Sequence, residues 1–456
     1  MTQEKKLRFL TVLFWMLLFL INFGHAAGWS GVYSLLIKEI GTASLSSFFL
    51  FSALGGFVLN VALMFFADVF SNEKLVRFSF LGFIAILETD LFVLANSQAF
   101  SAENYKLLLI FLAVLIIAVP SVYIIQSWNM INKTFSPKSA ANVYPLLTTA
   151  SLIGSIIGGA TANRLPYHLP AEMLIRTWAL SIFTAFLITF ALKRLKVKES
   201  EKNENENENE NGNKSKKNLL KNFAEGLKYF KNSDFARHLG VVFMSFWLVC
   251  TLIDFCYGKM LDKTYGSPEE IASFTGAYTT AANVAALLIQ TFVGAKLLKI
   301  TGVRNGFLAL PVSQIVCFAF MIASPGLMPV AATMFMQTLI GMSIQSNSIQ
   351  VSFNIFADSV RGKIRTLLEG IINPLGGVIA SLTIIGIERT QNNVALPIEE
   401  LLPWVGIFFA GIWLIFTFKI RKSYFREIRR TRKIGTEEGK KDAMEALEIE
   451  RRAKLH

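Results

Sequence analysis

The chain has few charged residues, few histidines and few cysteines for its length. Of its 456 residues only 17% are charged and 53% are hydrophobic, whereas a soluble domain carries about 25% charged residues. The three cysteines, Cys250, Cys256 and Cys317, all lie in apolar runs, and the four histidines are scattered. This composition excludes an ordinary soluble domain and predicts a protein that crosses a membrane many times.

Catalytic signatures are also missing from the sequence. It contains no glycine-rich phosphate loop followed by Lys and Ser or Thr, no metal-spaced His, Cys and Glu set, and no plausible nucleophile–base pair. We therefore expect no enzyme activity, no metal and no cofactor. The net charge of +13 lies mainly in loops and tails, which favours anionic lipid at the cytoplasmic face over nucleic acid as a partner.

Twelve apolar stretches are long enough to cross a bilayer, for which a helix needs about 20 residues. They lie near residues 9–37, 44–70, 76–97, 106–132, 140–163, 172–194, 238–262, 269–295, 303–324, 328–355, 364–387 and 400–420. Most of the 45 Lys and Arg residues fall on one side of these spans. The positive-inside rule then predicts a multi-pass protein of the bacterial inner membrane with both termini in the cytoplasm.

The pattern of composition divides the chain into five parts. A six-helix bundle is expected at 1–196 and a second at 238–420, separated by a disordered cytoplasmic linker at 197–217 and an amphipathic interfacial helix at 218–237. A basic cytoplasmic tail follows at 421–456. The linker is rich in Asn and Glu and has almost nothing apolar to bury.

The two predicted bundles resemble each other. A constant offset aligns "FSPKSAANVYPLL" (Phe135–Leu147) with "FADSVRGKIRTLL" (Phe356–Leu368), and a glycine-rich run suited to close helix packing follows in each half. We therefore predict an all-α membrane protein of twelve transmembrane helices in two six-helix pseudo-repeats, which is the major facilitator architecture.

Amide side chains form matching stripes in the fourth and tenth spans. Because an unpaired amide is costly in lipid, these stripes are expected to face other helices or a wet cavity. They predict either a binding site for a polar organic solute or interhelical hydrogen bonds without a ligand. The residues are Gln126, Asn129 and Lys133 in span four, and Ser343, Asn347, Gln350 and Asn354 in span ten.

Ionisable residues within the spans are the other candidates for transport, because charge at membrane depth is costly. Two lysines, Lys259 and Lys38, are suited to draw in an anionic solute, and four acids are candidates for coupling or charge balance. These are Asp254, Glu369, Glu88 and Asp90. Structural ion pairs are the alternative interpretation, such as Glu369 with Arg365 four residues earlier.

Four stretches resemble the ATP/ADP translocase family, the nucleotide transporters of plastids and obligate intracellular bacteria within the major facilitator superfamily. They are "EIGTASLSSF" from Glu39, "QSWNMINKTFSPKSAANVYPLL" from Gln126, "NFAEGLKYFKNSDFARHLGVV" from Asn222 and "LIDFCYGKMLDKTYGSPEEIASFTGAY" from Leu252. The resemblance implies a nucleotide-like solute carried by an antiporter, and a functional role for the acid at Asp254.

Three departures accompany this resemblance. Val32-Tyr33 stands where the family's nucleotide carriers have Lys-Asp, and Tyr257-Gly258 stands where they have Trp-Lys. The segment "NIFADSVRGKIR" replaces a Pro-Leu-Asp loop. These positions help to bind nucleotide phosphates in the family, so the resemblance implies a divergent relative rather than an ATP/ADP exchanger.

We therefore expect a monomeric secondary active transporter that moves a polar or anionic organic solute by alternating access. Two alternatives stay open. One is a proton-coupled permease for a non-nucleotide solute. The other is a non-transporting membrane scaffold or sensor, with the basic tail as its docking helix.

Overall fold

A computed structural model describes residues 3–66, 71–135, 137–200, 224–353, 355–356, 358–390 and 397–434. These residues are almost entirely helical and contain no β-strand. Eleven of their helices are long and apolar enough to cross a membrane, and a shorter apolar helix, Leu327–Ile340, lies within the predicted tenth span. The predicted twelve spans agree with this arrangement. Most of the predicted linker, the end of the basic tail and Asn354 lie outside the described residues.

The chain divides into two compact units. Unit 1 contains Met1–Ser44, Val58–Asn218 and Tyr265–Val284, and unit 2 contains Leu45–Phe57, Leu219–Thr264 and Ala285–His456. The helices α2 (Leu45–Phe66) and α9 (Pro268–Ile289) are therefore each shared between the units. The finer boundaries expected from composition, at 196 and 238, stay predictions.

The elements follow one another with short connections. The first half contains α1 (Gln3–Ile40), η1 (Thr42–Ser44), α2, α3 (Asn72–Ala95), η2 (Ser97–Ala99), α4 (Ala102–Thr134), α5 (Pro137–Arg164), η3 (Leu165–Tyr167) and α6 (Glu172–Ser200). The second contains α8 (Asp234–Thr264), α9, η4 (Gln290–Gly294), α10 (Ala295–Ala323), α11 (Leu327–Ile340), η5 (Gly341–Gln345), α12 (Ser346–Phe353), α13 (Asp358–Leu367), η6 (Leu368–Ile372), α14 (Asn373–Thr390) and α15 (Ile398–Ile434).

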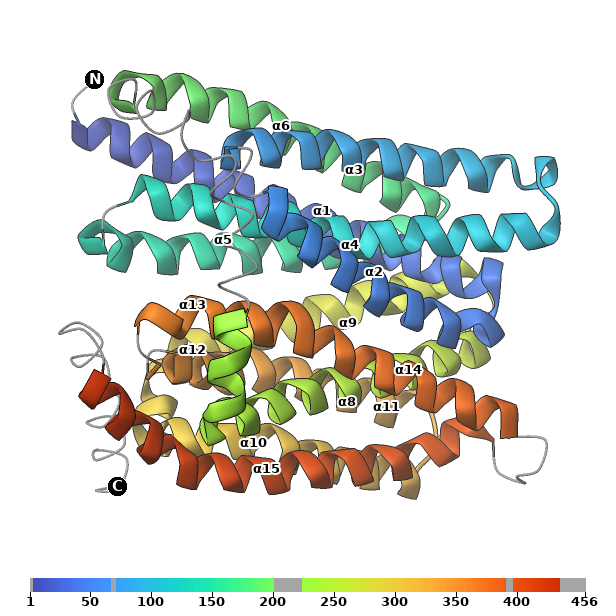
Figure 1. Ribbon diagram of the computed structural model, residues 1–456. Coiled ribbons are helices and arrows are strands. Elements are labelled where there is room, and N and C mark those ends of the chain that lie inside the picture. The colour runs from blue at the N-terminus through green and yellow to red at the C-terminus, as the bar shows by residue number, and fades with distance from the viewer. Residues whose placement is uncertain are drawn as a thin grey trace. The chain divides into compact units, whose positions relative to one another are not determined.

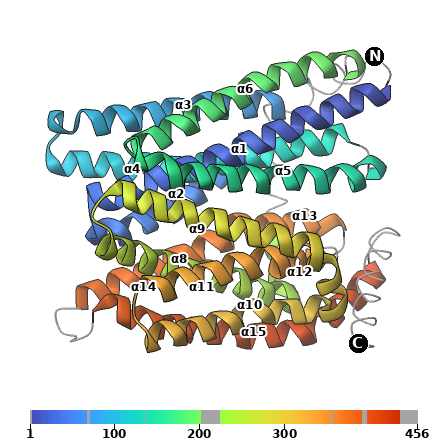
Figure 2. The same ribbon diagram turned by 180° about the vertical axis from the view of Figure 1, so that it is seen from behind.

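The two units repeat one packing pattern. In unit 1, α1 packs against α5 and α6, while α3 packs against α4 and α6 (Figure 1). In unit 2, α8 packs against α14 and α15, while α10 packs against α11 and α15 (Figure 2). Counted within its own half, the first span meets the fifth and sixth, and the third meets the fourth and sixth. The predicted pseudo-repeat is confirmed.

Glycines make the first-to-fifth contact in both units. A Cβ atom placed on Gly154 of α5 would clash with the backbone oxygen of Phe19 in α1. A Cβ atom on Gly376 of α14 would clash in the same way with the backbone oxygen of Met244 in α8. Only glycine permits such close backbone approach, which gives membrane helices their van der Waals contact. The glycine-rich runs are therefore packing surfaces, as their sequence predicted.

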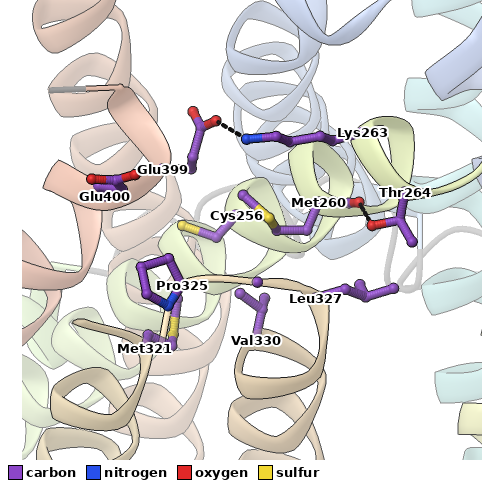
Figure 3. Close-up of a pocket in the computed structure, with 11 residues that line it drawn as sticks. Cys256, Met260, Lys263, Thr264, Met321, Pro325, Leu327, Val330, Glu399 and Glu400 are labelled. Carbon is purple, nitrogen blue, oxygen red and sulfur yellow. Dashed lines mark hydrogen bonds and ion pairs between the residues drawn. The ribbon is translucent and has the colours of Figure 1, made fainter. Parts of the chain in front are cut away.

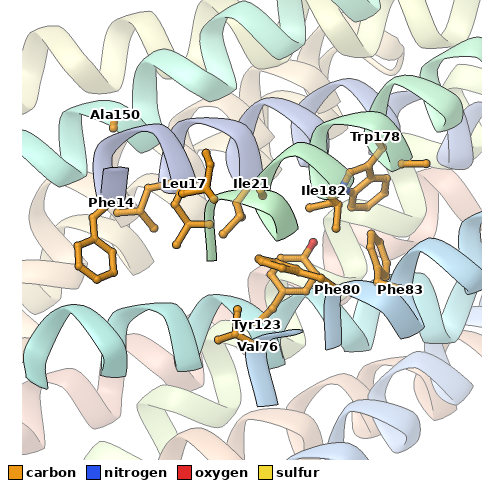
Figure 4. Packing of buried hydrophobic residues seen from close by; sticks show 14 of the residues in the cluster. Phe14, Leu17, Ile21, Val76, Phe80, Phe83, Tyr123, Ala150, Trp178 and Ile182 are labelled. Carbon is orange, nitrogen blue, oxygen red and sulfur yellow. The ribbon is translucent and has the colours of Figure 1, made fainter. Parts of the chain in front are cut away.

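Aromatic side chains fill the core of unit 1. Trp178 of α6 is fully buried and meets Phe83 of α3 edge-on, with ring centroids 4.9 Å apart. The ring centroids of Tyr123 in α4 and Phe80 in α3 lie 5.1 Å apart (Figure 4). A Cβ atom on Gly28 would clash with Trp178, so the small residues of α1 admit the indole. This core fixes α1, α3, α4 and α6 as one body.

The segment before α8 is also helical and packs on unit 2. Residues 224–232 form a helix in which Tyr229 donates a hydrogen bond to Glu427 of α15, and Ser233 donates to the same carboxylate at 2.7 Å. Glu427 is only 4% exposed. Burial, followed by the nearby Glu427 carboxylate, raises the pKa of the Tyr229 hydroxyl, which therefore keeps its proton and donates. The predicted amphipathic segment is helical here, and its contact with lipid stays a prediction.

Helix α15 continues well past the predicted end of the twelfth span. It runs to Ile434, and Tyr424 and Ile428 on its last turns are buried. The hydroxyl of Thr431 donates to the carbonyl of Ile355 at 2.5 Å. The first part of the segment expected as a basic tail is therefore a packed helical extension.

Candidate functional site

The amide pair predicted in span four is formed in unit 1. Gln126 of α4 is 3% exposed, and its Oε1 accepts a hydrogen bond from Nδ2 of Asn129 at 3.2 Å. Both residues thus share one face of α4, as the spacing required. Lys133 lies one turn further along the same helix, and its side chain is outside the described residues. The remaining donors and acceptors of the pair are suited to a polar solute.

The two acids predicted in span three have opposite surroundings. Glu88 of α3 is exposed, whereas Asp90 is 5% exposed and lines a small cavity with residues of α1 and α4. Side chains two residues apart on a helix point in different directions, so Glu88 and Asp90 contact different surroundings. The structure therefore does not place them together as one acidic pair.

Lys38 lies at the end of α1 in unit 1. Its Nζ donates a hydrogen bond to the backbone oxygen of Tyr265 at 2.7 Å. The ammonium group thus contacts the segment that leads into α9. This contact gives Lys38 a structural role alongside the solute-binding role proposed for it from the sequence.

Asp254, the acid emphasised by the sequence, is partly buried on α8 in unit 2. Cys250, one turn earlier, is within electrostatic range of Asp254, and its Sγ accepts a hydrogen bond from Nε2 of Gln337 at 2.9 Å. Gln337 belongs to α11, so three polar groups from two helices meet here. The sequence analysis identified Asp254 but missed Gln337. Gln337 is an amide in an apolar span, which is the signal that identified the amide stripes of spans four and ten.

Lys259 follows Asp254 on α8. Its Nζ lies 5.6 Å from the centre of the Phe255 ring, a cation–π distance, and the side chain is partly exposed. A partly exposed ammonium group at this position is suited to attract an anionic solute. Both residues of this contact belong to unit 2.

Glu369 lies in the π-helical segment η6 and pairs with Arg365. Nε of Arg365 lies 3.1 Å from both carboxylate oxygens, and both side chains are exposed. This is the ion pair that the four-residue spacing predicted. An exposed pair of this type contributes about 0–1 kcal/mol, so Glu369 is not a costly buried charge.

The predicted tenth span is not one continuous α-helix. It consists of α11, the π-helical segment η5 and α12. Further π-helical segments lie at the end of the predicted eighth span (η4) and within the eleventh (η6). Short π-helical segments occur frequently at functional sites. Asn347 and Gln350 lie in α12 and Ser343 in η5, and the side chains of all three are outside the described residues. The regular stripe expected in this span is thus interrupted before Asn347.

Sequence reasoning also missed a buried polar seam between α10 and the α11–η5–α12 segment. Gln314 is fully buried and Gln345 is 3% exposed. Neither amide has a hydrogen-bond partner within the described part of the chain, and the buried Ser348 hydroxyl has none there either. A Cβ atom on Gly306 would clash with the Ser348 oxygen, which shows how closely the helices approach. The sequence signal that could have indicated this seam was Gln314, a lone glutamine inside an apolar run.

A larger cavity lies within unit 2, between the ends of α8 and α10 and the starts of α11 and α15. It has a volume of about 220 Å³ (Figure 3). Lys263 reaches across it towards Glu399, with Nζ 3.7 Å from Oε1, and Glu400 lies nearby (Figure 3). Cys256 and Met260 also line it. No group of three or more His, Cys, Asp or Glu side chains suited to a metal occurs among the described residues.

The fold and its repeated bundles define a multi-pass membrane transporter with the major facilitator architecture. The model of the TLC ATP/ADP transporter family matches residues 110–362, more than half of the chain, and the chain belongs to this family. It is accordingly a secondary transporter of an organic solute. No curated protein sequence matches the chain.

Solved transporters share this fold. The nucleoside transporter NupG is 14% identical, with a TM-score of 0.60, over 91% of this chain and 99% of that chain. A bacterial homologue of the iron transporter ferroportin in an inward-facing state is 13% identical, with a TM-score of 0.63, over 92% and 99%. The peptide transporter POT in complex with sulfate is 12% identical, with a TM-score of 0.60, over 90% and 95%. At these identities the likeness extends to the fold alone.

Proposed function

We propose that the chain carries a nucleotide-like or other anionic organic metabolite across the bacterial inner membrane by alternating access, with both termini in the cytoplasm. The observation that supports this most is the family match over residues 110–362, together with two bundles that repeat one packing pattern. A repeated pair of bundles is the architecture in which one half rocks against the other around a midplane site.

Two polar clusters support the proposal, one in each unit. In unit 1 the cluster is Gln126 with Asn129, whose amides both donate and accept. In unit 2 it is Asp254 with Gln337, which Cys250 connects, and Lys259 lies little more than one turn further along α8. Amides suit a base or sugar, and the ammonium of Lys259 suits a phosphate or carboxylate. From the sequence, the proposed clusters also include Lys133, Asn347, Gln350 and Asn354.

The residues that replace the family's phosphate contacts limit the negative charge that the substrate can carry. Val32 and Tyr33 stand in place of a Lys-Asp pair, and they are 4% and 5% exposed. Two buried packing residues supply no charge to a triphosphate. We therefore propose a solute with less charge than ATP, such as a nucleoside monophosphate or another metabolite of low charge.

The test is uptake by proteoliposomes that contain the purified chain. Radiolabelled ATP, ADP, nucleoside monophosphates and nucleosides are each supplied outside, with and without unlabelled solute inside and with and without a proton gradient. We expect monophosphate uptake to exceed ATP uptake. Uptake of none of these solutes, together with no ligand-dependent thermal stabilisation, would contradict the proposed substrate class.

A further inference from the structure

The carboxyl group of Asp90 lies in a cavity whose other walls are apolar. Asp90 is 5% exposed, and no hydrogen bond or ion pair to it occurs among the residues that the structure describes. The cavity lies in unit 1 and is formed by residues of α1, α3 and α4. Besides Asp90 it is lined by Val32, Leu35, Leu36, Leu94, Leu109 and Ala113. A bare carboxylate in such surroundings is costly, so the position demands a bound positive partner.

The size and walls of the cavity decide which partner fits. Its volume of about 10 Å³ is close to that of a single water-sized probe, so an organic solute is excluded. A hard metal cation is bound through several oxygen ligands, and valine, leucine and alanine side chains supply none. A proton needs only the carboxylate itself. The cavity is therefore suited to a proton, with room for at most a single water molecule beside the carboxyl group.

Titratable groups on the neighbouring helices lie between or close to this cavity and exposed Glu39 of unit 1. The hydroxyl of Tyr105 on α4 donates to Oε2 of Glu39 on α1 at 2.9 Å, and Glu39 is exposed. Tyr105 is also within electrostatic range of Asp90 and of Glu172 on α6. The Oε2 atom of Glu172 is buried and has no hydrogen-bond partner in the described part of the chain.

We propose that Asp90 is a proton-binding site of unit 1, filled from the surface through Glu39 and Tyr105. The proton forms an O–H bond with a carboxylate oxygen of Asp90, and on release it returns to a water or to Glu39 by the same route. Any use of this proton in transport rests on the proposed transport function, which the proton site extends. The proton binding itself requires no solute.

Infrared difference spectroscopy on the full chain in lipid nanodiscs tests the site directly. The pH is stepped while the carbonyl stretch of protonated carboxyl groups is followed in H2O and D2O. We expect the wild type to show a carboxylic-acid band that is lost in Asp90→Asn. Glu88→Gln, on the same helix but exposed, is the matched control and keeps the band. An Asp90→Asn spectrum identical to that of the wild type would overturn the proposal.

Two further variants test the site and its route. Asp90→Glu keeps a carboxyl group one methylene longer, so its band persists at a shifted position; an unshifted band would assign the signal elsewhere and overturn the proposal. Tyr105→Phe removes the hydroxyl bonded to Glu39 and is expected to slow the response of the band to a pH step. An unchanged rate would overturn the route. If proteoliposomes move no nucleotide but the Asp90 band is present, the substrate proposal fails while the proton site stands.

Discussion

Three hydrogen bonds join Asn163 of α5 and Ser273 of α9, one of them from Nδ2 of Asn163 to the Ser273 hydroxyl oxygen at 3.2 Å. Nδ2 of Asn163 donates to the backbone oxygen of Ser273 at 3.0 Å, and the Ser273 hydroxyl donates to the backbone oxygen of Asn163 at 2.9 Å. Glycine permits this approach, since a Cβ atom on Gly276 would clash with the backbone nitrogen of Asn163. The two helices come from different halves of the sequence, yet these residues belong to the same unit.

The first prediction follows from this contact. Gly276→Ala places a methyl group against backbone that has no room to yield, and overpacking of this type costs about 1–3 kcal/mol. We expect a lower midpoint of thermal unfolding in detergent. Gly82→Ala in α3 is the control, because no atom lies within 4 Å of its added Cβ. An equal midpoint in the two variants would contradict the close approach of α5 and α9.

The amide pair of α4 gives the second prediction. Asn129→Ala removes the donor to Gln126 and one of the groups proposed to contact the solute. We expect KM for uptake into proteoliposomes to rise about 10-fold, which corresponds to about 1.4 kcal/mol of lost binding. Asn132→Ala, on the same helix but exposed, is the control. A KM that is the same in both variants would assign the pair to helix packing.

Asp254 gives the third prediction. Asp254→Asn keeps the shape of the side chain and removes its charge, so we expect uptake to fall at least about 10-fold if the acid takes part in transport. Asp262→Asn, two turns further along α8, is the matched control and is expected to transport normally. Thermal unfolding of each variant shows whether the protein is folded. Full uptake by a folded Asp254→Asn variant would remove Asp254 from the proposed site.

The buried Glu427 carboxylate gives the fourth prediction. Tyr229→Phe leaves Oε1 of Glu427 without its donor at a buried position, which costs about 1–3 kcal/mol. We expect the midpoint of thermal unfolding to fall. Lys228→Ala changes the neighbouring exposed residue and serves as the control. A second change, Glu427→Gln, made in the Tyr229→Phe background, should recover part of the loss, because a neutral amide is less costly to bury than a carboxylate.

Much of the fold could be predicted from the sequence because the bilayer imposes a simple rule. Each crossing requires about 20 apolar residues, so the spans around residues such as Phe83 and Trp178 were visible without knowledge of their partners. Gly154 and Gly376 indicated close helix packing from the sequence, because a glycine-rich run permits close backbone approach whichever helix lies opposite. The ion pair of Arg365 with Glu369 also followed from helical spacing alone.

The candidate sites were less predictable, because they depend on which face of each helix is covered. Glu88 and Asp90 are two residues apart and equally acidic, yet only Asp90 is buried in unit 1. The contact of Gln337 with Cys250 joins residues far apart in the chain, and no periodicity indicates it. The π-helical segment η5 shifts the helical register before Asn347, which an ideal helical stripe does not anticipate.

The sequence by itself determined the membrane class, the spans and the repeated halves, because burial of apolar side chains and the charge of loops are local properties. Only the tertiary structure decided that Glu427 is enclosed by Tyr229 and Ser233 and that Asp90 faces an apolar cavity. The physical reason is that the cost of a charge depends on every helix packed around it, and that set is fixed only when the chain has folded.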